Sequence, residues 1–175
     1  YEARRFWELS DDRVKDNGSD PDAMMRALED FGACEWESAP FDIASFRDDP
    51  KWINRRPGSV AYTAAQQIRC RLTPILALGN GLWYALRYAM QEEREAVSLA
   101  IEVTPAFDDP RDGVVDDISG KSRGLHAVEV DEFTEDGAWI ANSWGTGYGI
   151  KGRSLLTPRF LAARCVWAGS LEVYP

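Results

Sequence analysis

The chain has 175 residues, of which 45% are hydrophobic and 11% aromatic, enough for one packed domain or two small lobes that share a core. A net charge of −9 argues against nucleic acid or an anionic membrane as a partner. The longest uncharged stretch, residues 72–86, is too short to span a bilayer and is interrupted by Pro74.

The cysteines are odd in number and contain no Cys-x-x-Cys pair. They are Cys34, Cys70 and Cys165. This spacing argues against a zinc site and against a full disulfide framework. One bridge with one free thiol remains open, but three buried thiols fit the sequence better.

The first half of the chain is expected to be helix and loop. Asp20 can cap a helix that begins at Pro21 and ends at Gly32. The apolar residues expected on its inner face are Met24, Leu28 and Phe31. A second helix is expected over residues 82–93, because apolar residues recur there at helical spacing.

The second half is expected to be mainly antiparallel sheet. The segment "AVSLAIEV", residues 96–103, alternates in the manner of a strand. A polar loop over residues 107–124 precedes further strands. Helices first and strands second predict an α+β fold, with a helical lobe over residues 1–95 and a β-rich lobe over residues 96–175.

The one histidine of the chain, His126, begins a predicted hairpin that ends at Asn142. The strands are "LHAVEV" and "AWIAN", with Asp136–Gly137 as turn chemistry. A symmetric hairpin centred near Thr134 places His126 directly opposite Asn142, where Cβ atoms lie about 4.5–5.5 Å apart. The amide oxygen could then accept a ring N–H and leave the other ring nitrogen for proton transfer. Taken alone, a single strand histidine is more often structural.

Three motifs accompany this pair: "HAV", "NSWG" sixteen residues later, and "YGIKG". Together they resemble the C-terminal lobe of the papain-like cysteine peptidases. The resemblance implies a papain-like two-lobe fold, with His126 as the catalytic base and Asn142 as its orienting residue. It also implies that Trp144 covers the contact between them. Tyr148 stands where the family usually has Trp.

A fainter resemblance extends upstream. "DNGSDPDAMMRALEDFGAC" is similar to the family's Asn-Gly-Gly turn and following helix, which would place Asn17, Gly18 and Ser19 at the edge of a substrate cleft. A plain helix-cap turn is the alternative. Leu125, next to the histidine, is also assigned to substrate binding. "FDIASFRDDP", residues 41–50, looks like the Pro-Tyr-Asp-rich stretch of bacterial members.

The family's nucleophile has no counterpart in this chain. Family members carry a Gln and then a Gly-Cys-Trp type of segment that opens a long buried helix. Cys34 follows a helix end, where the helix dipole disfavours a thiolate. Cys70 precedes Pro74, which would break a helix begun there, and Cys165 lies near the final strand. We therefore expect none of the three thiols to be the nucleophile, and we expect the chain to lack the Cys-bearing helix.

Two functions remain open at this point. The chain, which begins at Tyr1 rather than Met, could be part of a cysteine peptidase whose nucleophile lies on an upstream segment or a second chain. It could instead be an inactive papain-like module with a binding or structural role in a larger assembly. A related amidase or transferase is a weaker third possibility. The peptidase hypothesis implies a peptide or protein substrate and no metal or organic cofactor, and it leaves the compartment open.

Overall fold

The computed structural model describes residues 2–3, 18–40, 55–77, 79–93 and 95–174. Asn17 and the "FDIASFRDDP" stretch lie outside these residues. The chain forms two compact units: residues 1–72 together with 172–175, and residues 73–171. We call them the N-terminal unit and the β-rich unit and describe each by itself. Their bounds differ from the 1–95 and 96–175 lobes expected from the sequence.

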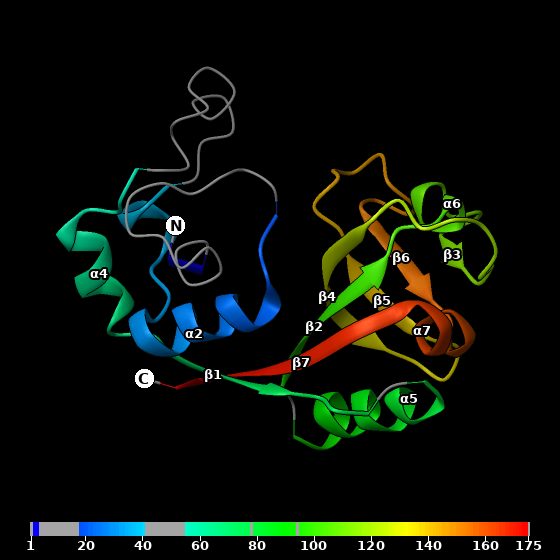
Figure 1. Ribbon diagram of the computed structural model, residues 1–175, viewed down its shortest axis with the longest axis horizontal. Helices are drawn as coiled ribbons and strands as arrows, with labels where there is room; N and C mark the ends of the chain where they lie inside the picture. Colours follow the sequence, from blue (N-terminus) through cyan, green and yellow to red (C-terminus); the bar gives the residue numbers. More distant parts are fainter. Residues whose placement is uncertain (1, 4–17, 41–54, 78, 94, 175) are drawn as a thin grey trace. The chain divides into compact units, whose positions relative to one another are not determined.

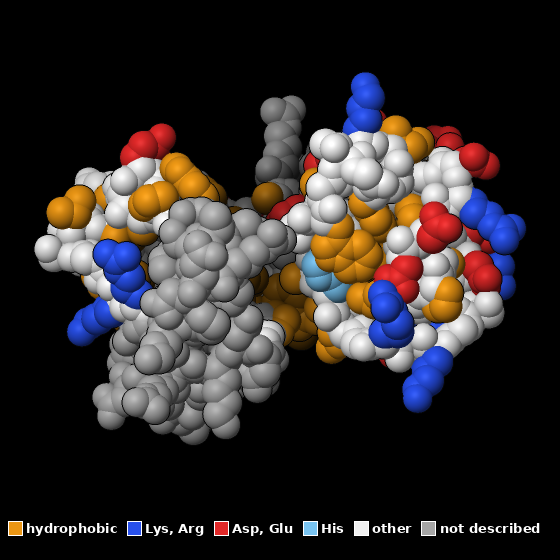
Figure 2. All heavy atoms as spheres, turned by 90° about the horizontal axis from the view of Figure 1, so that it is seen from above, with side chains coloured by type: hydrophobic (Ala, Val, Ile, Leu, Met, Phe, Trp, Pro, Cys, Tyr) orange, Lys and Arg blue, Asp and Glu red, His pale blue; other side chains and the backbone are white. Residues whose placement is uncertain are grey.

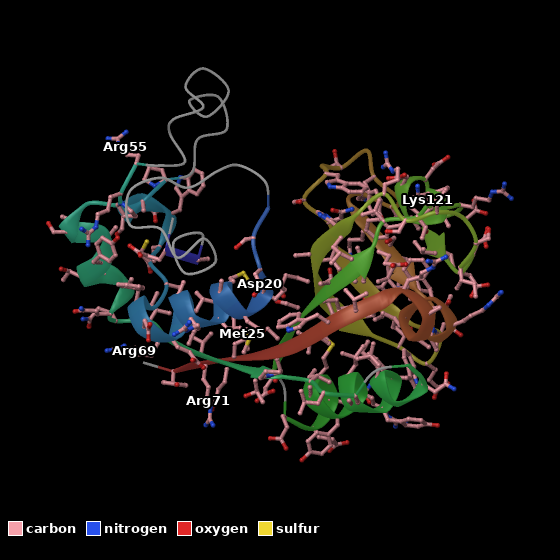
Figure 3. The ribbon with its side chains drawn as sticks, viewed as in Figure 1. Asp20, Met25, Arg55, Arg69, Arg71 and Lys121 are labelled. Carbon is pink, nitrogen blue, oxygen red and sulfur yellow. The ribbon has the colours of Figure 1, made fainter. Side chains whose placement is uncertain are left out.

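The main helix of the N-terminal unit, α2 (Pro21–Phe31), begins and ends where the sequence predicts. The Asp20 carboxylate at its start (Figure 3) accepts hydrogen bonds from the backbone N–H groups of Asp22 and Ala23, at 3.0 and 3.2 Å. Gly32 ends the helix with a φ of 79°. The buried side chains are Ala23 and Met25, whereas the predicted row of Met24, Leu28 and Phe31 is only half-buried.

The rest of this unit is short elements. They are the 3₁₀ helix η1 (Trp36–Ser38), the helix α4 (Ser59–Ala65) and the strand β1 (Arg69–Pro74), which leads into the β-rich unit. Strand β1 is an addition to the helix and loop expected over residues 1–95.

A seven-stranded sheet is the largest feature of the chain (Figure 1), with the strand order β1-β7-β2-β4-β5-β6-β3. The remaining strands are β2 (Ala96–Glu102), β3 (Val114–Val115), β4 (Leu125–Phe133), β5 (Ala138–Ala141), β6 (Arg153–Leu156) and β7 (Cys165–Tyr174). The pairs β2–β4, β2–β7, β4–β5 and β5–β6 are antiparallel, as predicted. The two-residue pair β3–β6 is parallel.

Helices accompany the sheet in the β-rich unit. They are α5 (Asn80–Arg87), its π-helical continuation η3 (Tyr88–Glu92), α6 (Pro105–Asp108) and α7 (Pro158–Arg164). Helices α5 and α7 contact each other, and α7 and η3 also contact β2. None of the helices in the described ranges is both long and apolar enough to cross a membrane.

The core of the β-rich unit explains why α5 belongs with the sheet. Val97, Leu99 and Ile101 of β2 are completely buried, and the strand predicted there is confirmed, although Ser98 and Ala100 on its other face are buried as well. Leu82 and Leu86 of α5 are also completely buried and belong to the same hydrophobic cluster. Burial of a Leu or Val side chain contributes about 1.5–3 kcal/mol, so this contact ties residues 80–92 to the sheet rather than to the helices before them.

We predict that Gly32→Ala strongly destabilises the N-terminal unit. Gly32 has φ 79° and ψ −167°, a region that is essentially restricted to glycine. An added Cβ would also lie 2.0 Å from the backbone oxygen of Ala65. Gly18→Ala is the matched control, because Gly18 also has a positive φ of 92° but nothing within 4 Å of its Cβ position.

The free energy of unfolding from denaturant titration measures both variants. Gly18→Ala should lower the free energy of unfolding by only about 1–2 kcal/mol, the cost of holding an alanine at a positive φ. Gly32→Ala should cost at least about 2 kcal/mol more, because a backbone oxygen must move. Equal losses in the two variants would contradict the close packing of Gly32 against α4.

Candidate active site

Strand β4 places His126 on the core face of the sheet, near one end. Within β4, alternate residues share a face, and Val128 and Val130 on the face of His126 are buried. His126 pairs with Ile101 of β2, which is itself completely buried. The imidazole is half-buried, because it stands where the strand begins. One side of the ring therefore meets the core and the other is accessible.

Asn142 lies directly after β5 and holds the imidazole by a hydrogen bond. The distance from His126 Nε2 to Asn142 Oδ1 is 2.9 Å. The prediction that these two side chains lie within hydrogen-bonding reach is therefore confirmed. Because Oδ1 can only accept, Nε2 carries the proton. No described residue forms a hydrogen bond with Nδ1, so that nitrogen can act as a base.

The predicted register of the hairpin is wrong by two residues. Strand β4 pairs with β5 through Glu129 and Ala141, and continuing this register places Val128 opposite Asn142. His126 and Asn142 are thus diagonal neighbours, with Cα atoms about 7–8 Å apart, rather than directly opposed. A shift of two residues keeps both side chains on one face, so the hydrogen bond forms all the same.

The turn and a bulge cause this difference. The turn is closed at Thr134 and Gly137, where the Thr134 N–H donates to the Gly137 oxygen at 2.9 Å, so its centre falls between Glu135 and Asp136 and not at Thr134. The register then shifts between Val130 and Glu132. A bulge of this kind puts one extra residue in β4, which a symmetric hairpin does not allow for.

An aromatic cluster surrounds the imidazole. The Trp144 ring lies 4.8 Å from the His126 ring, with 31° between their planes. Trp144 also contacts Phe107 at 5.3 Å and Tyr148 at 5.4 Å, both edge-on, which is a favourable arrangement for aromatic rings. Figure 2 shows the histidine at the surface with hydrophobic side chains beside it. The indole is still 42% exposed, so it forms the rim of the site.

Sequence reasoning missed Phe107 in this cluster. Its completely buried ring lies 6.1 Å from the imidazole. The residue belongs to the short helix α6, which is capped by the buried Thr104 hydroxyl accepting from the Phe107 N–H at 3.4 Å. Thr-Pro at positions 104–105 signals the helix start, but nothing in the sequence indicates that it packs against His126.

Ser154 was missed as well. It is completely buried in β6, and its hydroxyl lies 3.0 Å from the hydroxyl of the buried Tyr148. Burial raises the pKa of Tyr148, and the hydrogen bond with Ser154 acts in the opposite direction. The phenol group is therefore a neutral hydroxyl at physiological pH.

The expected substrate-binding residues fall in different units. Leu125 directly precedes His126, belongs to the β-rich unit and is 65% exposed. Gly18 and Ser19 are exposed residues of the N-terminal unit, just before α2. The positive φ of Gly18 favours glycine there whether or not a substrate approaches. Substrate binding by these three residues stays a prediction.

The three cysteines are free thiols, but only two of them are buried as expected. Cys70 and Cys165 are buried, and Cys34 is half-buried. Cys165 pairs with Ile101 from the side opposite to His126, so β2 separates the two residues and their backbones lie about 10 Å apart. Burial raises the pKa of Cys165 to about 11. A thiol in this state is a poor nucleophile.

In the parts of the chain that the structure describes, no cluster brings together three or more His, Cys, Asp or Glu side chains in a way that could hold a metal ion. The described site consists of the histidine–asparagine pair and its aromatic surroundings. This arrangement can hold an imidazole in one tautomer and accept or deliver a proton at Nδ1.

Comparison with solved structures identifies the fold. Xylellain, a cysteine protease from Xylella fastidiosa, matches 99% of this chain and 68% of its own, with a TM-score of 0.76 at 14% identity. The Carica candamarcensis cysteine protease CMS1MS2 matches 94% of this chain and 73% of its own, with a TM-score of 0.61 at 19% identity. Digestive procathepsin L 3 of Tenebrio molitor larval midgut has a TM-score of 0.59 at 16% identity and matches 86% of this chain.

The chain spans about half the length of that procathepsin, 49%. No family model matches the sequence, and no curated protein does. At 14% to 19% identity, the likeness shows the fold. The chain has the papain-like α+β fold, and the resemblance first indicated by "HAV" and "NSWG" is confirmed at that level.

We predict that Cys70 and Cys165 resist modification in the folded protein at pH 8. Burial raises the pKa of both thiols. Because the pKa of Cys165 is about 11, only about one Cys165 side chain in a thousand is a thiolate at pH 8. Mass spectrometry after treatment with a thiol-directed epoxide should show Cys34 modified first. The other two should react only after unfolding in denaturant.

The thiolate fraction of Cys165 should rise about tenfold per pH unit up to its pKa, so labelling should accelerate between pH 8 and pH 10. The decisive control is the same experiment on His126→Ala. A fast adduct on any of the three cysteines that disappears in His126→Ala would mean that the chain carries its own nucleophile.

Proposed function

We propose that this chain is the histidine- and asparagine-bearing part of a papain-like peptidase that hydrolyses peptide bonds with a cysteine nucleophile. The nucleophile would be supplied by an upstream segment of the polypeptide or by a second chain. The substrate would be a peptide or protein, and the reaction would need no metal or organic cofactor.

One observation carries this proposal. His126 Nε2 lies 2.9 Å from Asn142 Oδ1, which fixes the proton on Nε2 and leaves Nδ1 as the basic nitrogen. A Cys–His couple with an asparagine behind the histidine is a recurring arrangement for nucleophilic catalysis. The ring of Trp144, stacked 4.8 Å from the imidazole, limits the water that can compete for the hydrogen bond. A histidine with a purely structural role would not need a free Nδ1 on the open side of the ring.

The reaction would then follow from these positions. His126 Nδ1 takes the proton of the incoming thiol, and the thiolate attacks the peptide carbonyl to form a C–S bond. The imidazolium returns the proton to the leaving amine as the C–N bond breaks. Nδ1 next takes a proton from water, whose oxygen displaces the thiolate from the acyl group. Asn142 holds the ring in one orientation through all of these steps.

The nucleophile is the part of the mechanism that this chain does not provide. Cys165 is buried on the far side of β2 from His126, and burial suppresses its thiolate. Cys34 follows the end of α2 and Cys70 is buried in β1, so neither opens a long buried helix as the nucleophile of the family does. An external cysteine is therefore the source of the thiolate in this proposal.

A second candidate function follows if no thiol is available to His126. If the complete protein has no cysteine next to His126 Nδ1, the chain is an inactive papain-like module with a binding or structural role. The hydrogen-bonded histidine–asparagine pair favours the peptidase, because a structural module has no need for an oriented imidazole with one free nitrogen.

We predict that the complete native protein cleaves peptides in a thiol-dependent manner. A broad fluorogenic peptide library, assayed with and without a thiol-blocking reagent, measures this activity. His126→Ala should lower kcat/KM by roughly four orders of magnitude or more, since parts of such a catalytic unit act together. Asn142→Ala should cause a smaller loss, because the base remains and only its orientation suffers.

Lys121→Ala is the matched control, because Lys121 is an exposed loop residue of the same unit (Figure 3). It should leave activity unchanged. If the native protein shows no thiol-sensitive cleavage of any peptide in the library, and His126→Ala leaves its assembly state unchanged, the inactive module is the correct function.

A further inference from the structure

The contact between His126 and Asn142 requires the extra residue in β4. The first pair of the two strands beyond the turn is Phe133 with Ala138. If regular pairing continued from there, Asn142 would lie opposite Glu129. Because His126 is three residues from Glu129, an odd number, the imidazole and the Asn142 amide would then face opposite sides of the sheet. The bulge is what returns them to the same side.

The extra residue is Asp131. Val130 pairs with Ile140 and Glu132 pairs with Trp139, so Asp131 has no residue opposite to it in β5. A bulge has to be held at one place, because moving it along a strand turns the residues that it passes to the other face. A group that holds Asp131 in place therefore also holds the offset between β4 and β5.

The side chain of Arg153, in β6, binds this bulge. Its Nη2 donates to Asp131 Oδ1 at 2.9 Å and to Glu132 Oε2 at 3.0 Å. Its Nε lies 2.8 Å from Asp131 Oδ2, within ion-pair distance although without hydrogen-bond alignment. To reach β4 the guanidinium passes over Trp139 of β5, with its carbon 5.1 Å from the centre of that ring. One side chain thus contacts both the extra residue and its neighbour.

The backbone of Arg153 is tied to the strand end that carries Asn142. Arg153 pairs with Ala141, the residue directly before Asn142. The Asn142 N–H donates to the oxygen of Gly152 at 2.9 Å, and Arg153 exchanges two backbone hydrogen bonds with Ile150, at 2.9 and 3.1 Å. Arg153 therefore links the end of β5 to the bulge of β4.

This network selects a pairing more than it adds stability. The side chains of Arg153, Asp131 and Glu132 are 38%, 37% and 54% exposed, and ion pairs at such exposure contribute little to the overall stability of a fold. Adjacent residues of a regular strand point to opposite faces, so Asp131 and Glu132 could not both bind one guanidinium there. At the bulge they can, and Arg153 therefore favours the pairing in which the bulge lies at Asp131.

We propose that Arg153 is a positioning residue that fixes the bulge of β4 and thereby holds Asn142 within hydrogen-bonding distance of His126. Its strand partner Ala141 faces the side of the sheet opposite to Asn142, so Arg153 acts through the register and not by contact with the imidazole. The effect on the pair is a property of the chain itself, whereas the effect on catalysis rests on the proposed function.

The test is nitrogen-15 NMR of the imidazole in the complete native protein, at a pH where the ring is neutral. The His126 signals are assigned by their loss in His126→Gln. The wild type should show one tautomer with a slowly exchanging proton on Nε2. Arg153→Met keeps an unbranched apolar stem and removes the charge, so it should give a mixture of tautomers and faster exchange of that proton.

The register is measured in the same samples by cross-strand nuclear Overhauser effects between the backbone protons of Glu129 and Ala141. These effects should weaken in Arg153→Met. Arg153→Lys should restore both the register and the tautomer in part, because a lysine keeps the charge but cannot bind two carboxylates with one planar group.

Two further variants complete the set. Asp131→Ala should act in the same direction as Arg153→Met but less, because the ion pair with Glu132 remains. Arg159→Met is the matched control, since Arg159 also pairs with an aspartate of the same unit, at 3.5 Å, and is 62% exposed. It should leave the His126 signals unchanged. Thermal unfolding checks that each variant is folded, and Asp131→Ala decides the question if Arg153→Met does not fold.

Kinetics give a second measurement. We expect kcat of Arg153→Met to fall about fivefold, the loss expected from one ordinary hydrogen bond, with an unchanged KM. A folded Arg153→Met that keeps the wild-type tautomer and proton exchange would overturn the proposal. So would a changed tautomer with an unchanged register, because Arg153 would then act by another route. An absence of cleavage by the wild type would count against the proposed function alone, since the NMR experiment decides the role of Arg153 without it.

Discussion

The hydrogen bond between His126 and Asn142 depends on the register in which three strands of the sheet are paired. Strand β4 is fixed on one side by six consecutive pairs with β2, and the pair of His126 with the buried Ile101 is among them. On its other side it is fixed by β5, whose end delivers Asn142. Because alternate residues of a strand face opposite sides, an odd shift would carry one of the two side chains to the wrong face. The even, diagonal offset is what allows the contact.

The core behind this site explains why the register is so well determined. Val97, Leu99 and Ile101 are completely buried, and so are Leu82 and Leu86 from α5. Ser98 and Ala100 on the other face of β2 are buried as well, so slipping β2 by one residue would force the three larger apolar side chains into the space of these smaller ones. The geometry of a polar pair at the surface is therefore maintained by apolar contacts that lie away from it, and the aromatic rings of Phe107, Trp144 and Tyr148 continue those contacts up to the imidazole.

Cys165 and His126 have opposite environments although both pair with Ile101 of β2. Cys165 is surrounded by the core, where burial raises its pKa to about 11 and keeps the sulfur protonated. His126 stands at the end of its strand, where one ring nitrogen is bonded and the other is free among the described residues. The histidine is thus oriented to accept a proton, whereas Cys165 is held in its protonated form.

The sequence by itself determined the local features and the type of site. The capped start of α2 at Asp20, the strand β2 and the link between "HAV" and "NSWG" all depend on neighbouring residues or on short spacings, which a sequence displays directly. The α+β papain-like fold and the contact between His126 and Asn142 followed from them. Only the tertiary structure decided the hairpin register, the partner of α5 and the presence of Phe107 and Ser154 in the site. A bulge moves one residue without a strong sequence signal, and an amphipathic helix does not reveal which core it will join, because those choices are made by the packing of residues far apart in the chain.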